Sequence, residues 1–201
     1  MKSNIKKIYL NAQRSLYTDI NGKVNKLNFQ YIFVKILIPI CSVCIVYLNR
    51  EKLIEDPKII GTLLSLFSGL MFGVLIKIPD KFKDIEGKEN QTNQDKFKRL
   101  QIKNYLKLFM FSLSYSILVA LFSIFFVVTS SFYPLLINQN LNQYHLISNF
   151  KEIELANTFT FLVIIVFRFL LISFILNFLF FILKAVSNLY EFMLYEFNKL
   201  K

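Results

Sequence analysis

Four long apolar runs dominate this sequence and limit what it can fold into. They cover residues 31–48, 59–78, 108–128 and 159–183. A helix needs about 20 apolar residues to cross the hydrocarbon of a bilayer, and each run is close to that length. Within a membrane only helices and closed barrels satisfy their backbone, and solid apolar runs lack the alternation of barrel strands. The sequence therefore predicts an all-α polytopic membrane protein with four transmembrane helices in residues 31–183.

The distribution of basic residues predicts how these helices are oriented. The chain carries a formal net charge of +11. Seventeen Lys and Arg residues fall in residues 1–30, 79–107 and 184–201, against four in the connections 49–58 and 129–158. This is the positive-inside asymmetry, which places both termini and the loop 79–107 in the cytoplasm of a bacterium with the spans in its inner membrane. We expect topology and lipid attraction, rather than nucleic-acid binding, to explain the charge.

The segments that flank the apolar runs are predicted to be amphipathic helices. Residues 1–30 have apolar residues at helical spacing, which is typical of an interfacial helix that ends at Asn21-Gly22. Its basic residues are expected to attract anionic lipids: Lys2, Lys6, Lys7 and Arg14. Residues 184–201 continue the fourth helix into the cytoplasm and carry an apolar stripe beyond the bilayer, which predicts contact with a partner or another subunit. The stripe includes Leu189, Tyr190, Met193, Leu194 and Phe197.

Local signals predict where several helices begin and end. Asp56 is expected to cap the second span, with Pro57 at its first position, and Pro79 to end it. Asp95 is expected to cap a helix that runs into the third span. The connection 129–158 is expected to fold over the outer mouth of the bundle.

Two ridges of small residues predict close helix packing. Gly61, Ser65, Gly69 and Gly73 follow one another at four-residue spacing in the second run. The third run has Ser112, Ser116 and Ala120 at the same spacing. Such ridges allow two helix backbones to approach closely. We expect them to pack against each other within one chain, with a contact between subunits as the alternative.

Arg168 interrupts the fourth run, "IIVFRFLLISFILNF", about 13 Å from its outer end at 1.5 Å per residue. A central Arg costs about 2.5–3.5 kcal/mol, which the surrounding apolar residues outweigh. None of the four runs offers a carboxylate. Arg168 is expected to bond to interior polar groups or backbone carbonyls; the alternatives are contact with water or lipid, and the lining of a pore. Ser173 and Asn177 form a second polar face.

No catalytic or metal site is apparent. Cys41 and Cys44 lie on an apolar helix without further cysteines, so we interpret them as packing residues, and His145 stands alone in the outer connection. Neither a phosphate-binding glycine loop nor a nucleophile set is present. We expect neither enzymatic activity nor a cofactor.

In its layout the chain resembles the KwaA family, the membrane subunits of the bacterial Kiwa anti-phage defence system. The resemblance rests on four spans, a basic amphipathic N-terminus, a second helix ending "GLMFGVLIKIPDKFKD" and a helical cytoplasmic tail. It implies an inner-membrane oligomer that detects infection at the envelope and works with a cytoplasmic subunit, KwaB, that acts on phage DNA. No family site residue can be matched to this sequence.

We therefore predict a sensor or anchor subunit that binds itself, with a tetramer as one candidate, together with a KwaB-like soluble protein and anionic lipids. The alternative is a small oligomeric ion channel that depolarises the membrane, with Arg168 near its lining.

Overall fold

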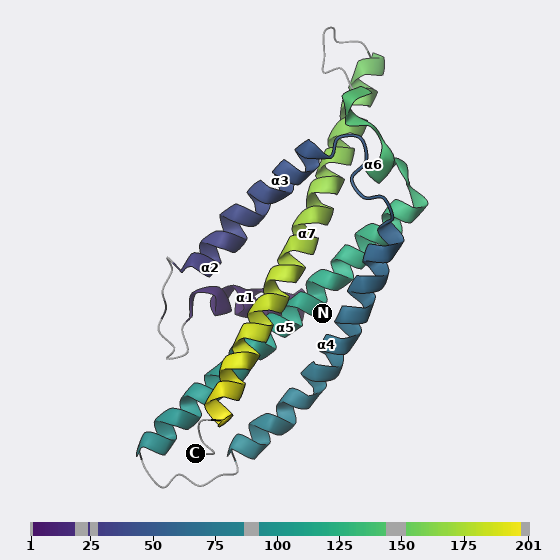
Figure 1. Cartoon of the computed structure of the whole chain (residues 1–201). Helices are drawn as coiled ribbons and strands as arrows, with labels where there is room; N and C mark the ends of the chain where they lie inside the picture. Colours follow the sequence, from purple (N-terminus) through teal and green to yellow (C-terminus); the bar gives the residue numbers. More distant parts are fainter. Residues whose placement is uncertain (1, 19–23, 25–27, 87–92, 144–151, 198–201) are drawn as a thin grey trace.

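A computed structural model shows an all-α protein with four helices that are long and apolar enough to cross a membrane (Figure 1). It describes residues 2–18, 24, 28–86, 93–143 and 152–197. The predicted fold class, an all-α polytopic membrane protein, is confirmed. The helices, in chain order, are α1 (Lys2–Tyr17), α2 (Phe29–Ile32), the π-helix η1 (Phe33–Leu37), α3 (Ile38–Leu48), α4 (Pro57–Glu86), α5 (Asn93–Phe132), α6 (Leu135–Asn138), the 3-10 helix η2 (Leu141–Gln143) and α7 (Glu152–Phe197).

The long helices α5 and α7 form the centre of the molecule. They pack against each other most extensively, while α4 lies against α5 and α3 lies against α7. Consequently α3 and α4, although consecutive in the chain, do not pack against each other extensively. Buried clusters follow the α5–α7 contact along its length; the middle one joins Leu64, Ala120 and Phe178. The bundle is therefore organised around its two longest helices.

The first span contains a π-helical turn next to a proline. Pro39 has no amide hydrogen, so the usual bond to the carbonyl four residues earlier cannot form. Immediately before it, the amide of Ile38 bonds to the carbonyl of Phe33, five residues back, which widens the helix. The apolar run did not predict this distortion, although Pro39 marks its position.

The helix ends agree with the predictions in part. α4 begins at Pro57, and the amide of Lys58 donates to the side chain of Asp56, which confirms the predicted cap. Pro79, in contrast, lies inside α4, so the predicted end there is wrong. A single missing amide removes one hydrogen bond, and the residues after it continue the ladder to Glu86. α1 ends at Tyr17, earlier than the predicted stop at Asn21-Gly22, which itself lies outside the described residues. Asp95 lies inside α5, so the predicted cap there is wrong.

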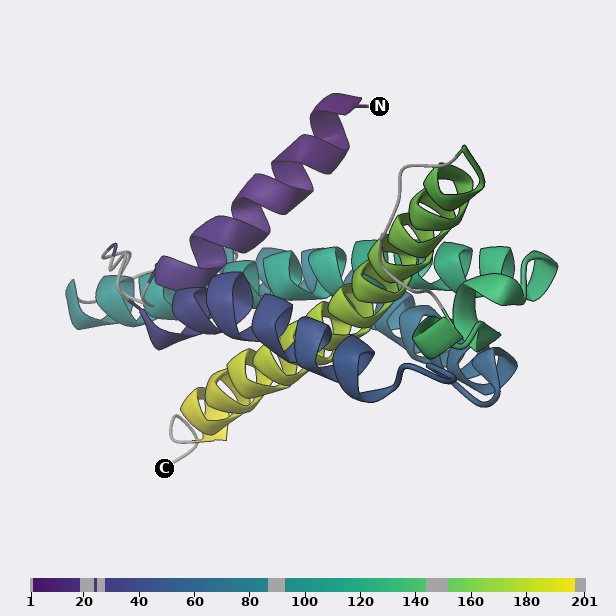
Figure 2. The same ribbon diagram turned by 90° about the horizontal axis from the view of Figure 1, so that it is seen from above.

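The two central helices are much longer than a bilayer is thick. α5 has 40 residues and α7 has 46, so they extend about 60 and 69 Å, against a hydrocarbon core of about 30 Å. Both therefore project beyond the membrane. α1 lies against α5 with its last turns and projects obliquely away from the bundle toward its N-terminus, as Figure 2 shows. It contacts the central helices near Tyr115 and Lys184, close to the ends of the predicted spans.

Candidate functional site

The guanidinium of Arg168 is fully buried and binds five backbone carbonyl oxygens. We call this group of acceptors the carbonyl cradle. Nε donates to Leu136 (3.1 Å), Nη1 to Asn49 (3.4 Å) and Arg50 (3.3 Å), and Nη2 to Ile137 (2.7 Å) and Gln139 (2.5 Å). The sequence left three environments open for Arg168: interior polar groups or backbone carbonyls, water or lipid, and the lining of a pore. The observed contacts match the first, in the form of backbone carbonyls.

The acceptors of the cradle belong to two helix ends. Asn49 and Arg50 follow the last residue of α3, and Leu136 and Ile137 lie in the single turn of α6. The last carbonyls of a helix have no partner within it and carry partial negative charge. A planar guanidinium has five donors and remains charged, so one side chain can cap both ends.

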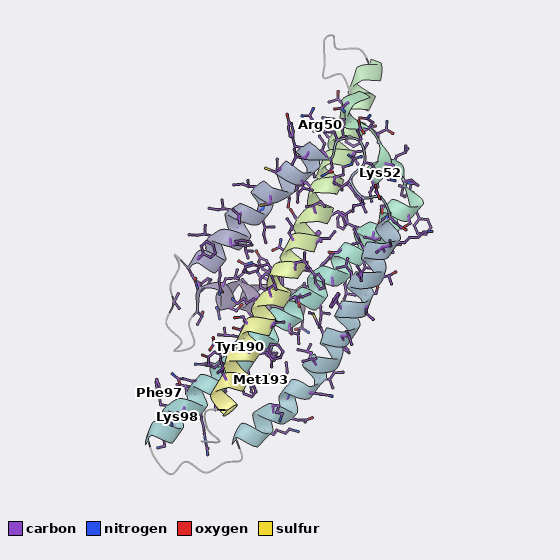
Figure 3. All side chains as sticks on the ribbon, viewed as in Figure 1. Arg50, Lys52, Phe97, Lys98, Tyr190 and Met193 are labelled. Carbon is purple, nitrogen blue, oxygen red and sulfur yellow. The ribbon has the colours of Figure 1, made fainter. Side chains whose placement is uncertain are left out.

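The two connections at this end of the bundle are also bonded to each other. The amide of Leu53 donates to the carbonyl of Ile137, and the amide of Leu141 donates to that of Arg50. Leu53, Ile137 and Leu141 are buried. We call this end, where Figure 3 labels Arg50 and Lys52, the cradle end. Arg168 thus sits beneath a folded cover made from residues 49–56 and 133–143.

The second polar face of α7 contacts α3. The hydroxyl of Ser173 donates to that of Ser42 at 2.9 Å, while Asn177 donates to the carbonyl of Ser173 on its own helix. Ser42 is fully buried and was not predicted as a site residue. It lies between Cys41 and Cys44, which are free thiols. The sequence signal that could have identified Ser42 is its small polar side chain within an otherwise apolar helix.

The two small-residue ridges do not pack against each other along their length. Ser112, Ser116 and Ala120 on α5 are fully buried. On α4, a Cβ added at Gly61 would lie 3.1 Å from Val127 on α5, whereas Gly69 and Gly73 have no such neighbour within 4 Å. Ser65 is exposed as well.

The geometry of an α-helix explains why the α4 ridge leaves the contact. Four residues turn through about 400°, so a strict four-residue spacing drifts by about 40° per step. From Gly61 to Gly73 the ridge rotates by about 120°, away from α5. Part of the ridge therefore lies on a face of α4 that no described part of the chain covers.

A second buried cation holds the N-terminal helix. Lys184 of α7 donates to the backbone carbonyl of Ser15 in the last turn of α1. Ser15, Ala12 and Leu16 are buried at this contact. At the other side of α1, Lys35 donates to the hydroxyl of Tyr9 at 3.2 Å. In the sequence, Lys184 contributed only to the count of basic residues that predicts membrane orientation. Its position directly after the fourth apolar run could have indicated a contact at the membrane boundary.

The predicted lipid-binding residues lie along α1. Lys6, Lys7 and Arg14 are exposed, and nothing is described of the Lys2 side chain. Arg14 and Lys107 line a cavity of about 230 Å³ between α1 and α5. A larger and more apolar cavity of about 620 Å³ lies between α3 and α7 near the cradle end, with Arg50 stacked on Tyr47 at its rim.

The predicted contact stripe on the last turns of α7 is divided between two environments. Phe192, which was not predicted, packs with Ile102 and Leu106 of α5, and Leu189 packs against the same cluster. Tyr190, Met193 and Leu194 remain exposed. Figure 3 shows Tyr190 and Met193 near the end of the bundle that carries Phe97. The side chain of Phe197 lies outside the described residues.

We call residues 93–107 of α5 and 184–197 of α7 the tail arm. Beyond the level of α1, marked by Asn104 and Lys184, α5 continues for about 17 Å and α7 for about 20 Å at 1.5 Å per residue. Their mutual packing through Phe192, Ile102 and Leu106 makes the arm a paired structure rather than two separate extensions.

No group of three or more metal-binding side chains occurs in the described part of the chain, and His145 is outside it. Comparison with protein-family models, with curated proteins and with solved structures finds no match to this chain. The class of protein therefore follows from the fold alone: a membrane protein whose described residues include four candidate transmembrane helices.

Proposed function

We propose that this chain is a homo-oligomeric inner-membrane subunit that anchors a soluble cytoplasmic protein and detects infection at the envelope. The role is the one implied by the resemblance to the KwaA family, and the partner is a KwaB-like subunit that acts on phage DNA. Both termini and the tail arm lie in the cytoplasm in this proposal, since the basic residues are concentrated on that side. Direct nucleic-acid binding by this chain is not expected.

The tail arm is the observation that carries the proposal. Tyr190, Met193 and Leu194 are exposed on a helix that continues beyond the level of α1, while its opposite side is anchored on α5 by Phe192. Exposed apolar side chains outside lipid favour a protein–protein contact. Aromatic residues and Met are enriched in the centres of such interfaces.

The exposed ridge on α4 supports assembly of several copies. Ser65, Gly69 and Gly73 leave a surface poor in side chains on a membrane helix, where another backbone can approach closely. The ion-channel alternative has less support, because the guanidinium that would line its pore already donates to five carbonyls.

The test is purification of the tagged full-length chain from its host in mild detergent, with the intact mass of the complex determined. We expect a soluble protein in fixed ratio. The double variant Tyr190→Asp/Met193→Asp should lose the soluble protein and keep the oligomer. The control Ile5→Asp/Leu10→Asp alters two exposed apolar residues of α1, outside the tail arm, and should retain the soluble protein. A homo-oligomer without any soluble protein in the parent would contradict the anchoring role.

A further inference from the structure

A small polar cavity lies where the last turns of α1 cross α5. Its volume is about 230 Å³, and its lining consists of Asn11, Arg14, Ser15 and Thr18 from α1 with Asn104, Lys107, Leu108 and Phe111 from α5. Among the described residues, two cations and no carboxylate line it. Arg14 and Lys107 form no ion pair within the described residues. The cavity therefore offers uncompensated positive charge.

The end of α1 does not cancel this charge. The last carbonyls of a helix repel an anion when they are left without partners. Here the carbonyl of Arg14 accepts from both the amide and the hydroxyl of Thr18, and that of Ser15 accepts from Lys184. Lys184 thus occupies a carbonyl of the cavity wall that would otherwise repel an anion.

The position and size of the cavity indicate what it holds. Lys107 directly precedes the third apolar run, so the cavity lies at the membrane boundary, and Leu108 and Phe111 form its apolar side. Its volume is below the range of about 300–1,000 Å³ that encloses whole small-molecule ligands. A headgroup whose acyl chains remain in the bilayer needs less enclosed space than such a ligand.

We propose that this cavity binds the phosphate of an anionic phospholipid, with Arg14 and Lys107 donating to the phosphate oxygens and the acyl chains lying along Leu108 and Phe111. Arg suits such a contact because its planar fork matches phosphate oxygens, and Lys supplies a compact charge. The bound lipid then ties α1 to α5. The site goes beyond the general attraction of Lys6 and Lys7 to a charged surface, and the soluble partner has no part in it.

The experiment is native mass spectrometry of the full-length chain in detergent, titrated with phosphatidylglycerol and, separately, with phosphatidylcholine. We expect one phosphatidylglycerol molecule per chain to bind with higher affinity than phosphatidylcholine. The variant Arg14→Gln/Lys107→Gln should weaken that binding about thirtyfold, since two cations are removed and each contributes about a factor of five near an anionic lipid. The control Lys83→Gln/Lys98→Gln removes the same charge from exposed positions on α4 and α5 outside the cavity and should leave the affinity unchanged.

Two other results of the titration would overturn the proposal. Equal weakening in the two variants would reduce the effect to general surface charge, and unchanged binding in the cavity variant would place the lipid elsewhere. A further arm uses glycerol 3-phosphate as the ligand: if this soluble ester binds as tightly as the lipid, the cavity recognises free phosphate. None of these lipid-binding measurements requires the soluble partner. If the parent protein binds no such partner, the proposed function fails while the lipid site can still be tested, so the two proposals fail separately.

Discussion

The ammonium group of Lys184 donates a hydrogen bond to the backbone carbonyl of Ser15, joining two residues that are 169 positions apart. The contact fastens the first helix of the chain to the last. Both residues are buried, so the amino group of Lys184 is removed from water and depends on this acceptor for its hydrogen bond. It is thus the counterpart, at the level of α1, of the contact that Arg168 makes at the cradle end.

Replacement of Lys184 by Met should release α1 from the bundle. Met keeps the length of the side chain but cannot donate, so the carbonyl of Ser15 loses its partner at a cost of about 1–3 kcal/mol. Hydrogen exchange of the amides of α1 should become faster, while exchange in α5 stays the same. Lys35→Met is the control, since its bond to Tyr9 is exposed and should cost less. Unchanged protection of α1 in the Lys184 variant would contradict this role.

Replacement of Arg168 by Leu should leave membrane insertion intact but loosen the cover at the cradle end. Leu inserts more favourably than Arg, whereas the five carbonyls lose a charged donor, and we expect at least about 3 kcal/mol of destabilisation. Thermal unfolding in detergent and hydrogen exchange of residues 49–56 and 135–141 provide the measurements. Arg168→Lys should recover only part of the loss, because an ammonium has three donors rather than five. A Leu variant with the parent's melting temperature and exchange would show that the cradle does not depend on the arginine.

Two glycine variants on α4 should separate folding from assembly. Gly61→Leu should destabilise the monomer by about 1–3 kcal/mol, because even a Cβ there would lie 3.1 Å from Val127. A Cβ added at Gly69 meets no described neighbour within 4 Å, so with Gly69→Leu the fold should persist while the intact mass of the oligomer changes. A Gly69 variant with the parent's stability and the parent's oligomeric mass would remove this ridge from the subunit contact.

Replacement of Pro39 by Ala should convert the π-turn to an ordinary α-helix. The restored amide can then bond to the carbonyl four residues earlier, and the segment before residue 39 rotates by about 100°. Lys35 would move away from Tyr9, so a double-mutant cycle with Lys35→Met and Tyr9→Phe should show coupling of about 0.5–1 kcal/mol in the parent and none in the variant. Pro79→Ala in α4 should leave this coupling unaltered. Persistence of the coupling without Pro39 would mean that other contacts hold the turn.

The helices were predictable because each depends on a continuous stretch of sequence. Twenty apolar residues, or Asp56 followed by Pro57, act locally and can be recognised without knowledge of the neighbours. Pro79 shows the limit of a local rule, since α4 continues through it.

The sites were only partly predictable because their partners are distant. Arg168 stood out as a charge in hydrocarbon, but its acceptors lie 29–119 positions away and are backbone atoms, which have no signature in the sequence. Lys184 and Ser42 depend in the same way on helices far along the chain. The α4 ridge was visible as spacing, whereas the face on which it ends depends on how α4 turns against α5.

The carbonyl cradle has a consequence for the order in which the protein is made. Its five acceptor residues, from Asn49 to Gln139, all precede Arg168, so the ribosome completes the acceptors before it adds the charge. When the last span leaves the translocation channel, its guanidinium enters a bilayer in which both acceptor segments are already present. The side chain that is most costly to insert is therefore synthesised after all of its hydrogen-bond acceptors. A change that delays the folding of residues 133–143 should leave Arg168 without these acceptors and make the newly inserted helix a target of membrane quality control.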